Sequence, residues 1–192
     1  MKTLIFATNN PNKILEIRAL LPTDFQLITL AEAGIDIDIP EPHPTIAENA
    51  TEKAKVIFAL TNKDCFGEDT GLEVEALGGE PGVLSARYAG VQANSQNNIA
   101  LLLQNMTNEL NRKAQFKTVI SLYINGVEKQ FMGICEGSIL KKPIGELGFG
   151  YDAIFVPNGS IKSFAEMELV EKNKYSHRKK AVSNLIAYLN TL

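Results

Sequence analysis

The chain has 192 residues, of which 45% are hydrophobic, and a formal net charge of −3. This length fits one compact or two-lobed domain with a real core, and the charge excludes a general attraction to nucleic acid, so local cations must bind any phosphate ligand. Two cysteines are too few for a disulfide framework, and no apolar run is long enough for a signal peptide or a membrane span, so we expect a cytoplasmic protein.

The first part of the chain predicts a strand, a helix and a second strand. Residues 4–7 form an apolar run that predicts a buried strand, and turn residues at 8–13 interrupt it. An amphipathic helix follows and ends before Pro22, and residues 26–30 predict a weaker strand. The segment 37–44 contains three prolines, so it is predicted to be extended.

The rest of the chain alternates predicted helices and strands. Thr45 and Glu48 fit a capping box that opens a helix running to about residue 60. The later predictions are a short strand at 65–68, a mobile glycine-rich loop at 78–82, a helix at 95–106, a hairpin of strands 116–124 and 128–135 around Asn125-Gly126, a strand at 154–156, and a last helix capped by Ser176. The interleaving predicts an α/β fold, and the hairpin favours a mixed sheet over a purely parallel one.

Two adjacent carboxylates, Glu68 and Asp69, end the predicted short strand and are followed at once by Thr70. Carboxylates at a strand-to-loop junction are a common way to hold a hard cation over a phosphate. Side chains alternate along a strand, so only one of the two can face a given cleft. Glu41 offers a second carboxylate, because Mg²⁺ usually takes one or two from the protein. The alternative is that these acids are simply solvated.

The loop at residues 8–13 is a candidate phosphate-binding segment. It joins a strand to a helix, where free N–H groups and the helix dipole favour an anion, and it ends in Lys13. Asn9, Asn10 and Asn12 tolerate left-handed backbone, which would aim N–H groups into a concave nest. The spacing of a P-loop is missing, and a plain polar loop is the alternative.

Lys53 lies in the middle of the apolar arc of the helix predicted from residue 45 to about 60. A solvated helix face would not place a lysine there. It could snorkel at the edge of the core, or it could cross the core face and reach a phosphate in a cleft. We favour the second interpretation.

Two further groups of residues are candidates for binding a base. Phe149 stands between two glycines, so its ring is either a stacking platform for a base or an inward-packing side chain. Arg178 follows His177 near the start of the last helix and shares a side with its apolar residues. A cation there opposes the helix dipole, so Arg178, with Lys172, is a candidate reader of ligand acceptor atoms. A basic surface turn is the alternative.

Together these blocks resemble the inosine/xanthosine triphosphate pyrophosphatase family, enzymes that remove deaminated purine nucleotides. The resemblance spans nearly the whole chain and rests, in order, on residues 8–13, 45–50 with Lys53, 68–74, 78–82, 85–88, 148–152, 164–166, 171–173 and 176–178. The chain departs from the usual pattern at Asn9 and Asn12, where glycine is common, and at Glu68, Thr70 and Ala153. None of these departures removes a charged group.

The resemblance implies a two-lobed α/β fold over residues 1–192, built on a long mixed sheet with the nucleotide in a cleft between the lobes, and a homodimer. It implies Mg²⁺-dependent hydrolysis of a purine nucleoside triphosphate to the monophosphate and pyrophosphate. Asp69 would be catalytic, and Glu41, Asp69 and Glu68 would hold the metal. Phosphate-binding residues would be Thr8, Asn9, Asn10, Pro11, Asn12, Lys13, Lys53 and Thr70. Residues that bind base and sugar would be Phe149, Gly150, Tyr151, Asp152, Lys172, His177 and Arg178.

Lys172, His177 and Arg178 would donate hydrogen bonds to the O6 and N7 atoms of hypoxanthine or xanthine, whereas the same donors would face the amino group of adenine unfavourably. Two alternatives remain open: a pyrophosphatase for pyrimidine or modified nucleotides, and a nucleotide sensor without turnover. Binding to nucleic acid is disfavoured because the sequence has no basic stripe.

Overall fold

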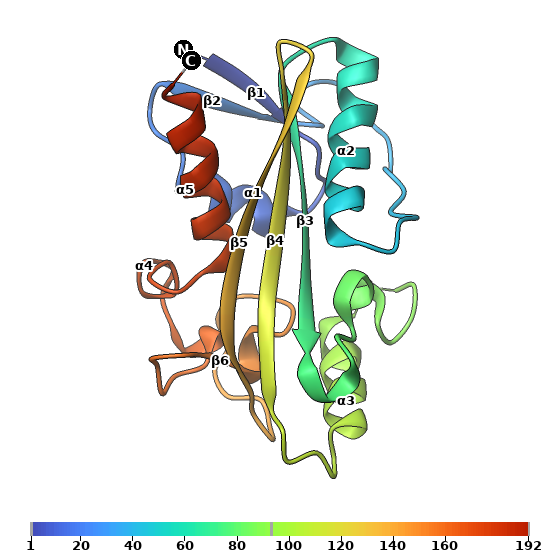
Figure 1. Ribbon diagram of the computed structural model, residues 1–192, viewed down its shortest axis with the longest axis vertical. Coiled ribbons are helices and arrows are strands. Elements are labelled where there is room, and N and C mark those ends of the chain that lie inside the picture. The colour runs from blue at the N-terminus through green and yellow to red at the C-terminus, as the bar shows by residue number, and fades with distance from the viewer. Residues whose placement is uncertain (1, 93, 192) are drawn as a thin grey trace. The chain divides into compact units, whose positions relative to one another are not determined.

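The computed structural model describes residues 2–92 and 94–191, which form an α/β fold around one six-stranded sheet of order β2-β1-β3-β4-β5-β6 (Figure 1). The strands are β1 (Lys2–Phe6), β2 (Phe25–Thr29), β3 (Cys65–Val74), β4 (Lys113–Ile124), β5 (Val127–Ile139) and β6 (Phe155–Pro157). The helices are α1 (Pro11–Arg18), α2 (Ile46–Thr61), α3 (Ser95–Asn105), α4 (Leu169–Lys172) and α5 (His177–Leu189).

The sheet is mixed, as predicted. β1 pairs in parallel with both β2 and β3, whereas β5 and β6 are antiparallel. The predicted hairpin of β4 and β5 is confirmed, and its turn uses positive φ at Asn125 (51°) and Gly126 (77°), as a two-residue hairpin turn requires. Within the described residues, no helix combines the length and apolar content needed to cross a bilayer.

The chain divides into two compact units. Unit 1 contains the described residues up to Asp69, together with Thr118–Gly133 and the residues from Arg178 onward. Unit 2 contains Thr70–Lys117 and Ile134–His177. Strands β3, β4 and β5 contribute residues to both units.

Unit 1 has three layers, which follow from the alternation of side chains along β1. Leu4 and Phe6 pack with Ile17 of α1 in one apolar cluster, whereas Ile5 and Ala7 pack in another cluster that includes α2. Since successive strand residues point to opposite faces, α1 and α2 cover opposite faces of the sheet. Leu4, Ile5 and Phe6 and the following Ala7 are buried, so both faces are sealed from water along the carboxyl-terminal part of β1, whereas Lys2 and Thr3 are exposed.

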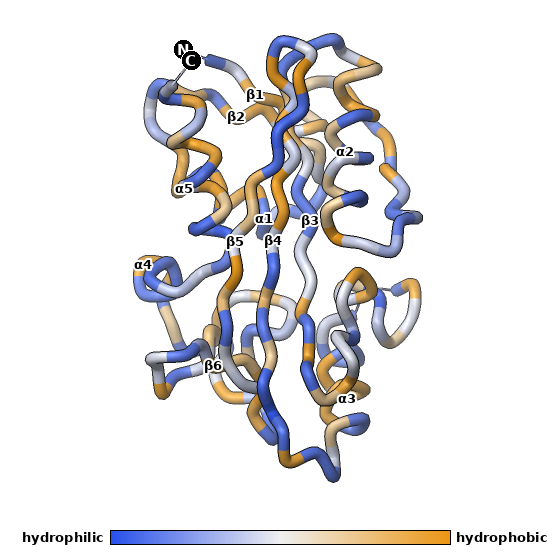
Figure 2. Tube along the Cα trace, in the orientation of Figure 1, coloured by the Kyte–Doolittle hydropathy of each residue, from blue (hydrophilic) through white to orange (hydrophobic). Residues whose placement is uncertain are grey.

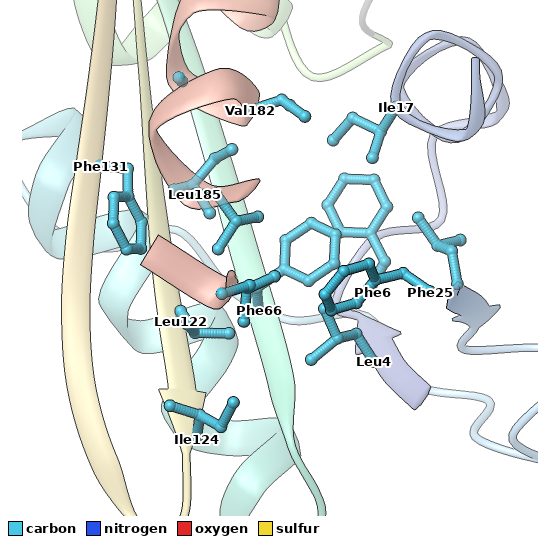
Figure 3. Packing of buried hydrophobic residues seen from close by; sticks show 14 residues of the cluster. Leu4, Phe6, Ile17, Phe25, Phe66, Leu122, Ile124, Phe131, Val182 and Leu185 are labelled. Atoms are coloured by element: carbon cyan, nitrogen blue, oxygen red, sulfur yellow. The ribbon is translucent and has the colours of Figure 1, made fainter. Parts of the chain in front are cut away.

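The first of these clusters is centred on two stacked rings. Phe6 and Phe66 from neighbouring strands lie 4.5 Å apart between centroids, with planes 14° apart. Val182 and Leu185 of α5 belong to the same cluster (Figure 3). α5 therefore closes the same face of the unit 1 sheet as α1, by burying its apolar side.

Unit 2 has its own core. Its buried apolar residues come from β3, β4 and β5, from α3, and from the irregular segments after β5. Phe116 is central, because its ring contacts Phe155 edge-on at 4.7 Å and stacks on His177 at 4.6 Å. Along α3 and α2, hydrophilic and hydrophobic residues alternate, as in helices that cover a core with one side (Figure 2).

Thr45 is the N-cap of α2 as predicted, since its side chain accepts a hydrogen bond from the backbone N–H of Glu48, whereas the Glu48 carboxylate accepts from the Thr45 hydroxyl. Several predicted ends are wrong: the hairpin strands β4 and β5 extend beyond the predicted 116–124 and 128–135, and the first helix and β3 differ as well. The first helix ends at Arg18, although Leu21 beyond it still packs on the unit 1 core. β3 runs to Val74, so Glu68 and Asp69 lie inside a strand and not at its end.

The longer β3 has a physical explanation. Glycine, glutamate and aspartate have low strand propensity, so the sequence after residue 66 does not predict a strand. Pairing within the sheet outweighs that local preference. β3 continues past the end of β1, whose last paired residue is Phe6 opposite Phe66.

Candidate functional site

The position of the candidate site follows from the order of the parallel strands. β1 lies between β2 and β3, and the connections through α1 and α2 leave on opposite faces of the sheet. The carboxyl end of β1, beside the first half of β3, is therefore a topological switch point, where α/β proteins commonly bind ligands. The loop at residues 8–13 leaves β1 here, and Glu68 and Asp69 of β3 extend past its end.

A glycine allows α2 to approach β3 at this point. A Cβ atom at Gly67 would lie 2.8 Å from both the backbone nitrogen of Ala54 and the Cβ of Lys53, which is closer than real contacts allow. Only glycine fits, and the close approach brings Lys53 across to β3. Lys53 crosses the core face, since its side chain is buried and its Nζ reaches residues of β3, whereas its predicted contact with a phosphate stays a prediction.

Two lysine ammonium groups meet at one backbone carbonyl. Nζ of Lys53 and Nζ of Lys13 each lie 3.3 Å from the carbonyl oxygen of Glu68. Lys53 also donates to Oδ1 of Asp69 at 2.9 Å and forms an ion pair with Glu41. Lys13 lies 3.6 Å from Oε2 of Glu68. Residues from four separate segments of the chain thus converge on one point of β3.

Glu68 and Asp69 face different neighbours, as strand alternation predicts. Asp69 bonds with Lys53 of α2, whereas the carboxylate of Glu68 accepts a hydrogen bond from Nη2 of Arg178 at 3.0 Å. The other guanidinium nitrogen of Arg178, Nη1, donates to Glu16 of α1. Arg178 is therefore the centre of a buried Glu16–Arg178–Glu68 network.

Glu16 was not among the predicted site residues. Its signal in the sequence is weak but present: it directly precedes Ile17, which packs in the core of unit 1, and it is itself buried. A buried carboxylate on a short helix requires a cationic partner. That partner, Arg178, lies 162 residues away in the sequence, so spacing could not reveal it.

The electrostatics favour a proton-accepting carboxylate, Asp69, beside a charged Lys53. Burial raises the pKa of Asp69 above its ordinary value, a shift that the nearby Lys53 and Lys13 oppose. For Lys53, burial lowers the pKa, but Asp69 and Glu41 outweigh it, so the net shift is upward and the side chain stays charged. Burial lowers the pKa of Lys13, and Glu68 counteracts part of this effect.

The first loop differs from its prediction. Among the described residues other than glycine, only Asn62 and Asn125 have positive φ, so the asparagines of residues 8–13 do not form a left-handed nest. Instead, Asn10 caps α1: its side chain accepts from the N–H groups of Asn12 (3.0 Å) and Lys13 (3.2 Å). An asparagine cap satisfies these groups with ordinary backbone, so no left-handed residue is needed.

The other residues of this loop support the same turn. Pro11 is the first residue of α1, where its missing N–H costs nothing. The hydroxyl of Thr8 accepts from the N–H of Asn10 at 3.2 Å, and Asn9 donates to the carbonyl oxygen of Ile37 at 3.0 Å. Thr70, the last predicted phosphate-binding residue, is half-buried in β3.

The carboxylates near Lys53 suit a hard cation. Oδ2 of Asp69 is buried and accepts no hydrogen bond from any described residue, which leaves it available to a ligand. Magnesium takes oxygen ligands and needs only one or two from the protein, so Asp69 with Glu41 fits it. Within residues 2–92 and 94–191 no three acidic, histidine or cysteine side chains form a preformed metal site, and Glu68 instead faces Arg178.

The predicted base-binding residues other than Arg178 belong to unit 2. Oδ2 of Asp152 accepts from the N–H of Phe149 (2.9 Å) and from Nζ of Lys172 (2.7 Å). Nζ of Lys172 also lies 5.3 Å from the centroids of the Phe149 and Phe164 rings, within cation–π range. A side chain at Gly148 would collide with the Asp152 carboxylate, so glycine is required before Phe149.

These contacts order the segment that carries Phe149, whose ring is half-buried. Gly150 has a φ of 61°, which allows the tight turn. Tyr151 is buried and donates its hydroxyl to the carbonyl oxygen of Ser85 at 2.9 Å. His177 is buried as well and packs against Phe116. Their predicted roles toward a base stay predictions.

Comparison with known proteins identifies the family. The family model described as the Ham1 family matches residues 4–188 of the chain. The chain belongs to the Ham1 family. The resemblance inferred from the sequence is thereby confirmed over almost the full length.

Relatives within the Ham1 family are similar along their whole length. A protein of Christiangramia forsetii named dITP/XTP pyrophosphatase is 50% identical over 187 residues, which covers 97% of this chain and 98% of that one. The dITP/XTP pyrophosphatase of Bacillus subtilis is 41% identical over 189 residues, with 96% of each chain covered. The solved structure of the Staphylococcus aureus Ham1 protein matches with a TM-score of 0.90 and 38% identity, over 99% of both chains.

A Ham1 protein of Coxiella burnetii gives a TM-score of 0.92 at 33% identity, with both chains fully covered. The α/β architecture and the order of its elements are therefore those of the Ham1 family. The switch-point cluster of Lys13, Lys53 and Asp69 lies inside the matched range.

Proposed function

We propose that this protein hydrolyses deaminated purine nucleoside triphosphates, namely dITP, ITP and XTP, to the monophosphate and pyrophosphate. The names of its relatives support this substrate class. The observation that carries the proposal is the pair of lysine ammonium groups on the Glu68 carbonyl, beside the buried carboxylate of Asp69. Cations and an available carboxylate at a switch point are suited to a phosphoryl group.

Lys13 and Lys53 bind the triphosphate in this proposal. Their ammonium groups arrive from α1 and α2 on opposite faces of β3, so they can contact different oxygens of one polyphosphate. They hold the leaving pyrophosphate and spread its developing charge. The helix N-terminus at Asn10 and Pro11 adds a favourable dipole at the same loop.

Asp69 is the proposed catalytic base. Its Oδ1 is fixed by Lys53, and its Oδ2 orients a water molecule and takes a proton from it. The water oxygen forms a bond to the α-phosphorus while the bond from that phosphorus to the oxygen bridging to the β-phosphorus breaks, and pyrophosphate leaves. The burial that raises the pKa of Asp69 makes it a stronger base than an exposed aspartate. Bound Mg²⁺, held by Asp69 and Glu41, would supply neutralisation of the phosphate charges.

Base selection is assigned to Phe149, Lys172, His177 and Arg178. The ring of Phe149 stacks on any purine, whereas hydrogen-bond donors select the acceptor atoms of hypoxanthine and xanthine over the amino group of adenine. Lys172 is already oriented by Asp152, which keeps its ammonium group beside the Phe149 ring. On the family resemblance we also propose a homodimer that acts in the cytoplasm.

A substrate panel tests this function. Pyrophosphate release would be measured by coupled phosphate detection for ITP, dITP, XTP, ATP, GTP, dTTP and UTP, each with Mg²⁺ and with EDTA. We expect the three deaminated purine nucleotides to exceed ATP by at least about 10²-fold in kcat/KM, because donors facing the adenine amino group are left unpaired. EDTA is expected to abolish turnover.

The panel also separates the alternatives. Higher rates with dTTP or UTP would favour a pyrimidine pyrophosphatase. Nucleotide binding without pyrophosphate release would favour a sensor and would overturn the enzymatic proposal.

A further inference from the structure

Glu41 is the most exposed of the acidic residues around Lys53, so burial alone does not hold it in place. The exposed fraction of its side chain is 25%, against 7% for Asp69 and 0% for Glu68. It lies in a segment with no helix or strand, whereas Asp69 and Glu68 are fixed by β3. Contacts must therefore hold Glu41 in place: its carboxylate pairs with Lys53, and the backbone that carries it has contacts of its own.

The segment around Glu41 is stiff. Pro40, Pro42 and Pro44 alternate with Glu41 and His43, and a residue that precedes proline is restricted to extended backbone. The three prolines have no N–H group, so within residues 40–44 only Glu41 and His43 can donate a backbone hydrogen bond. A contact that fixes His43 also fixes Glu41, because the rigid Pro42 is the only residue between them.

Asn49 makes that contact. Its Oδ1 accepts from the backbone N–H of His43 at 3.0 Å, and its Nδ2 donates to the carbonyl oxygen of the same residue at 3.1 Å. The side chain of Asn49 is fully buried, so its amide cannot exchange these partners for water. Asn49 is also one helical turn before Lys53 on α2, so it lies on the same side of that helix.

We propose that Asn49 is a positioning residue that holds His43, and through it Glu41, over Lys53. It does not touch substrate. It acts by fixing both backbone polar groups of His43 to α2, which also carries Lys53. The stiff spacer then delivers the Glu41 carboxylate to the ammonium group of Lys53, where their ion pair forms. The consequence for Mg²⁺ rests on the proposed function, but the positioning itself does not.

A merely structural role for Asn49 would be to stabilise the start of α2. The two roles predict different effects of replacing Asn49 in a protein that already lacks the Glu41 carboxylate. If Asn49 acts through Glu41, its loss costs little once Glu41 has been replaced. If it only stabilises the helix, its loss costs the same with or without Glu41.

The test is a double-mutant cycle of Asn49→Ala and Glu41→Gln with two measurements. The first is the Mg²⁺ concentration that gives half-maximal pyrophosphate release from ITP. We expect Asn49→Ala to raise it about tenfold in the wild-type background, as for residues that orient metal ligands, and less than about twofold in the Glu41→Gln background. An equal increase in both backgrounds would overturn the proposal.

The second measurement is amide hydrogen exchange of the peptide that covers residues 39–45, without nucleotide or metal. We expect Asn49→Ala to reduce its protection about tenfold, since the N–H of His43 loses its acceptor, and Glu41→Gln to leave it unchanged. Unchanged protection in Asn49→Ala would refute the proposal that Asn49 holds His43. This measurement is informative even if the wild-type protein releases no pyrophosphate.

Asn98→Ala is the matched control. Asn98 is a buried amide of unit 2 that holds residues 85–89 through the N–H of Ala89 and the carbonyl oxygens of Ser85 and Ala86. Its replacement is expected to lower stability without changing the half-saturating Mg²⁺ concentration. If Asn49→Ala does not fold, Asn49→Asp replaces it in the cycle, because the carboxylate still accepts from His43 but cannot donate.

Discussion

Asp69→Asn is expected to lower kcat by about 10³-fold, the contribution typical of a general base, while the protein stays folded. Asparagine has the same shape as aspartate and can still accept the hydrogen bond that Lys53 donates to Oδ1. It cannot take a proton from water, and it is a poor ligand for Mg²⁺. The effect should appear in kcat more than in KM for ITP, because Lys13 and Lys53 remain to bind the phosphates.

The measurement is steady-state pyrophosphate release, together with thermal unfolding to establish that the variant is folded. Asp64→Asn is the matched control, since Asp64 immediately precedes β3 and accepts a hydrogen bond from the N–H of Asn125. The Asp64→Asn variant should hydrolyse ITP at nearly the wild-type rate. A near-native rate for Asp69→Asn would remove Asp69 from the mechanism.

Arg178→Ala is expected to lower the free energy of unfolding by about 3–5 kcal/mol, the cost of breaking a buried ion-pair network by removing one partner. The guanidinium group is buried and bridges Glu16 and Glu68, which are themselves buried. Its removal takes the cation that Glu16 and Glu68 share out of a site with little access to water, and leaves Lys13 at 3.6 Å from Oε2 of Glu68.

The loss should depend on pH in a defined direction. In the variant, Glu16 and Glu68 stay buried without the guanidinium group, and burial disfavours the charged form of a carboxyl group. The folded state then binds more protons than the unfolded state, so the deficit is greatest at neutral pH and shrinks in acid. Urea unfolding of wild type and variant at neutral and mildly acidic pH would measure this.

Arg18→Ala is the control for removal of an arginine ion pair. Arg18 pairs with Glu32 at 2.8 Å, but both side chains are about half exposed. An exposed pair of this kind contributes less than about 1 kcal/mol. If Arg178→Ala cost no more than Arg18→Ala at neutral pH, the buried network would not stabilise the fold.

The sequence predicted the site best where a residue broke a local pattern. Lys53 stood out because a lysine in the apolar arc of a helix needs a buried partner, and the structure provides Asp69 and Glu41. The N-cap of α2 at Thr45 and the turn at Asn125-Gly126 were predictable for another reason, since each depends on a few adjacent residues.

The parts that the sequence could not predict depend on contacts between distant segments. β3 extends through glycines and acids because of its neighbours in the sheet, not its own propensity. The asparagines of the first loop suggested left-handed backbone, whereas Asn10 acts as a helix cap. The interaction of Arg178 with Glu16 links α5 to α1, and no local signal joins them.

The proposed mechanism depends most on which phosphorus atom the water molecule attacks. Asp69 is assigned to a water molecule that attacks the α-phosphorus. Hydrolysis of ITP in ¹⁸O-enriched water, with mass spectrometry of both products, measures this directly. We predict that the heavy oxygen enters inosine monophosphate and that the pyrophosphate carries none. Heavy oxygen in the pyrophosphate, or inosine diphosphate and orthophosphate as the products, would contradict it.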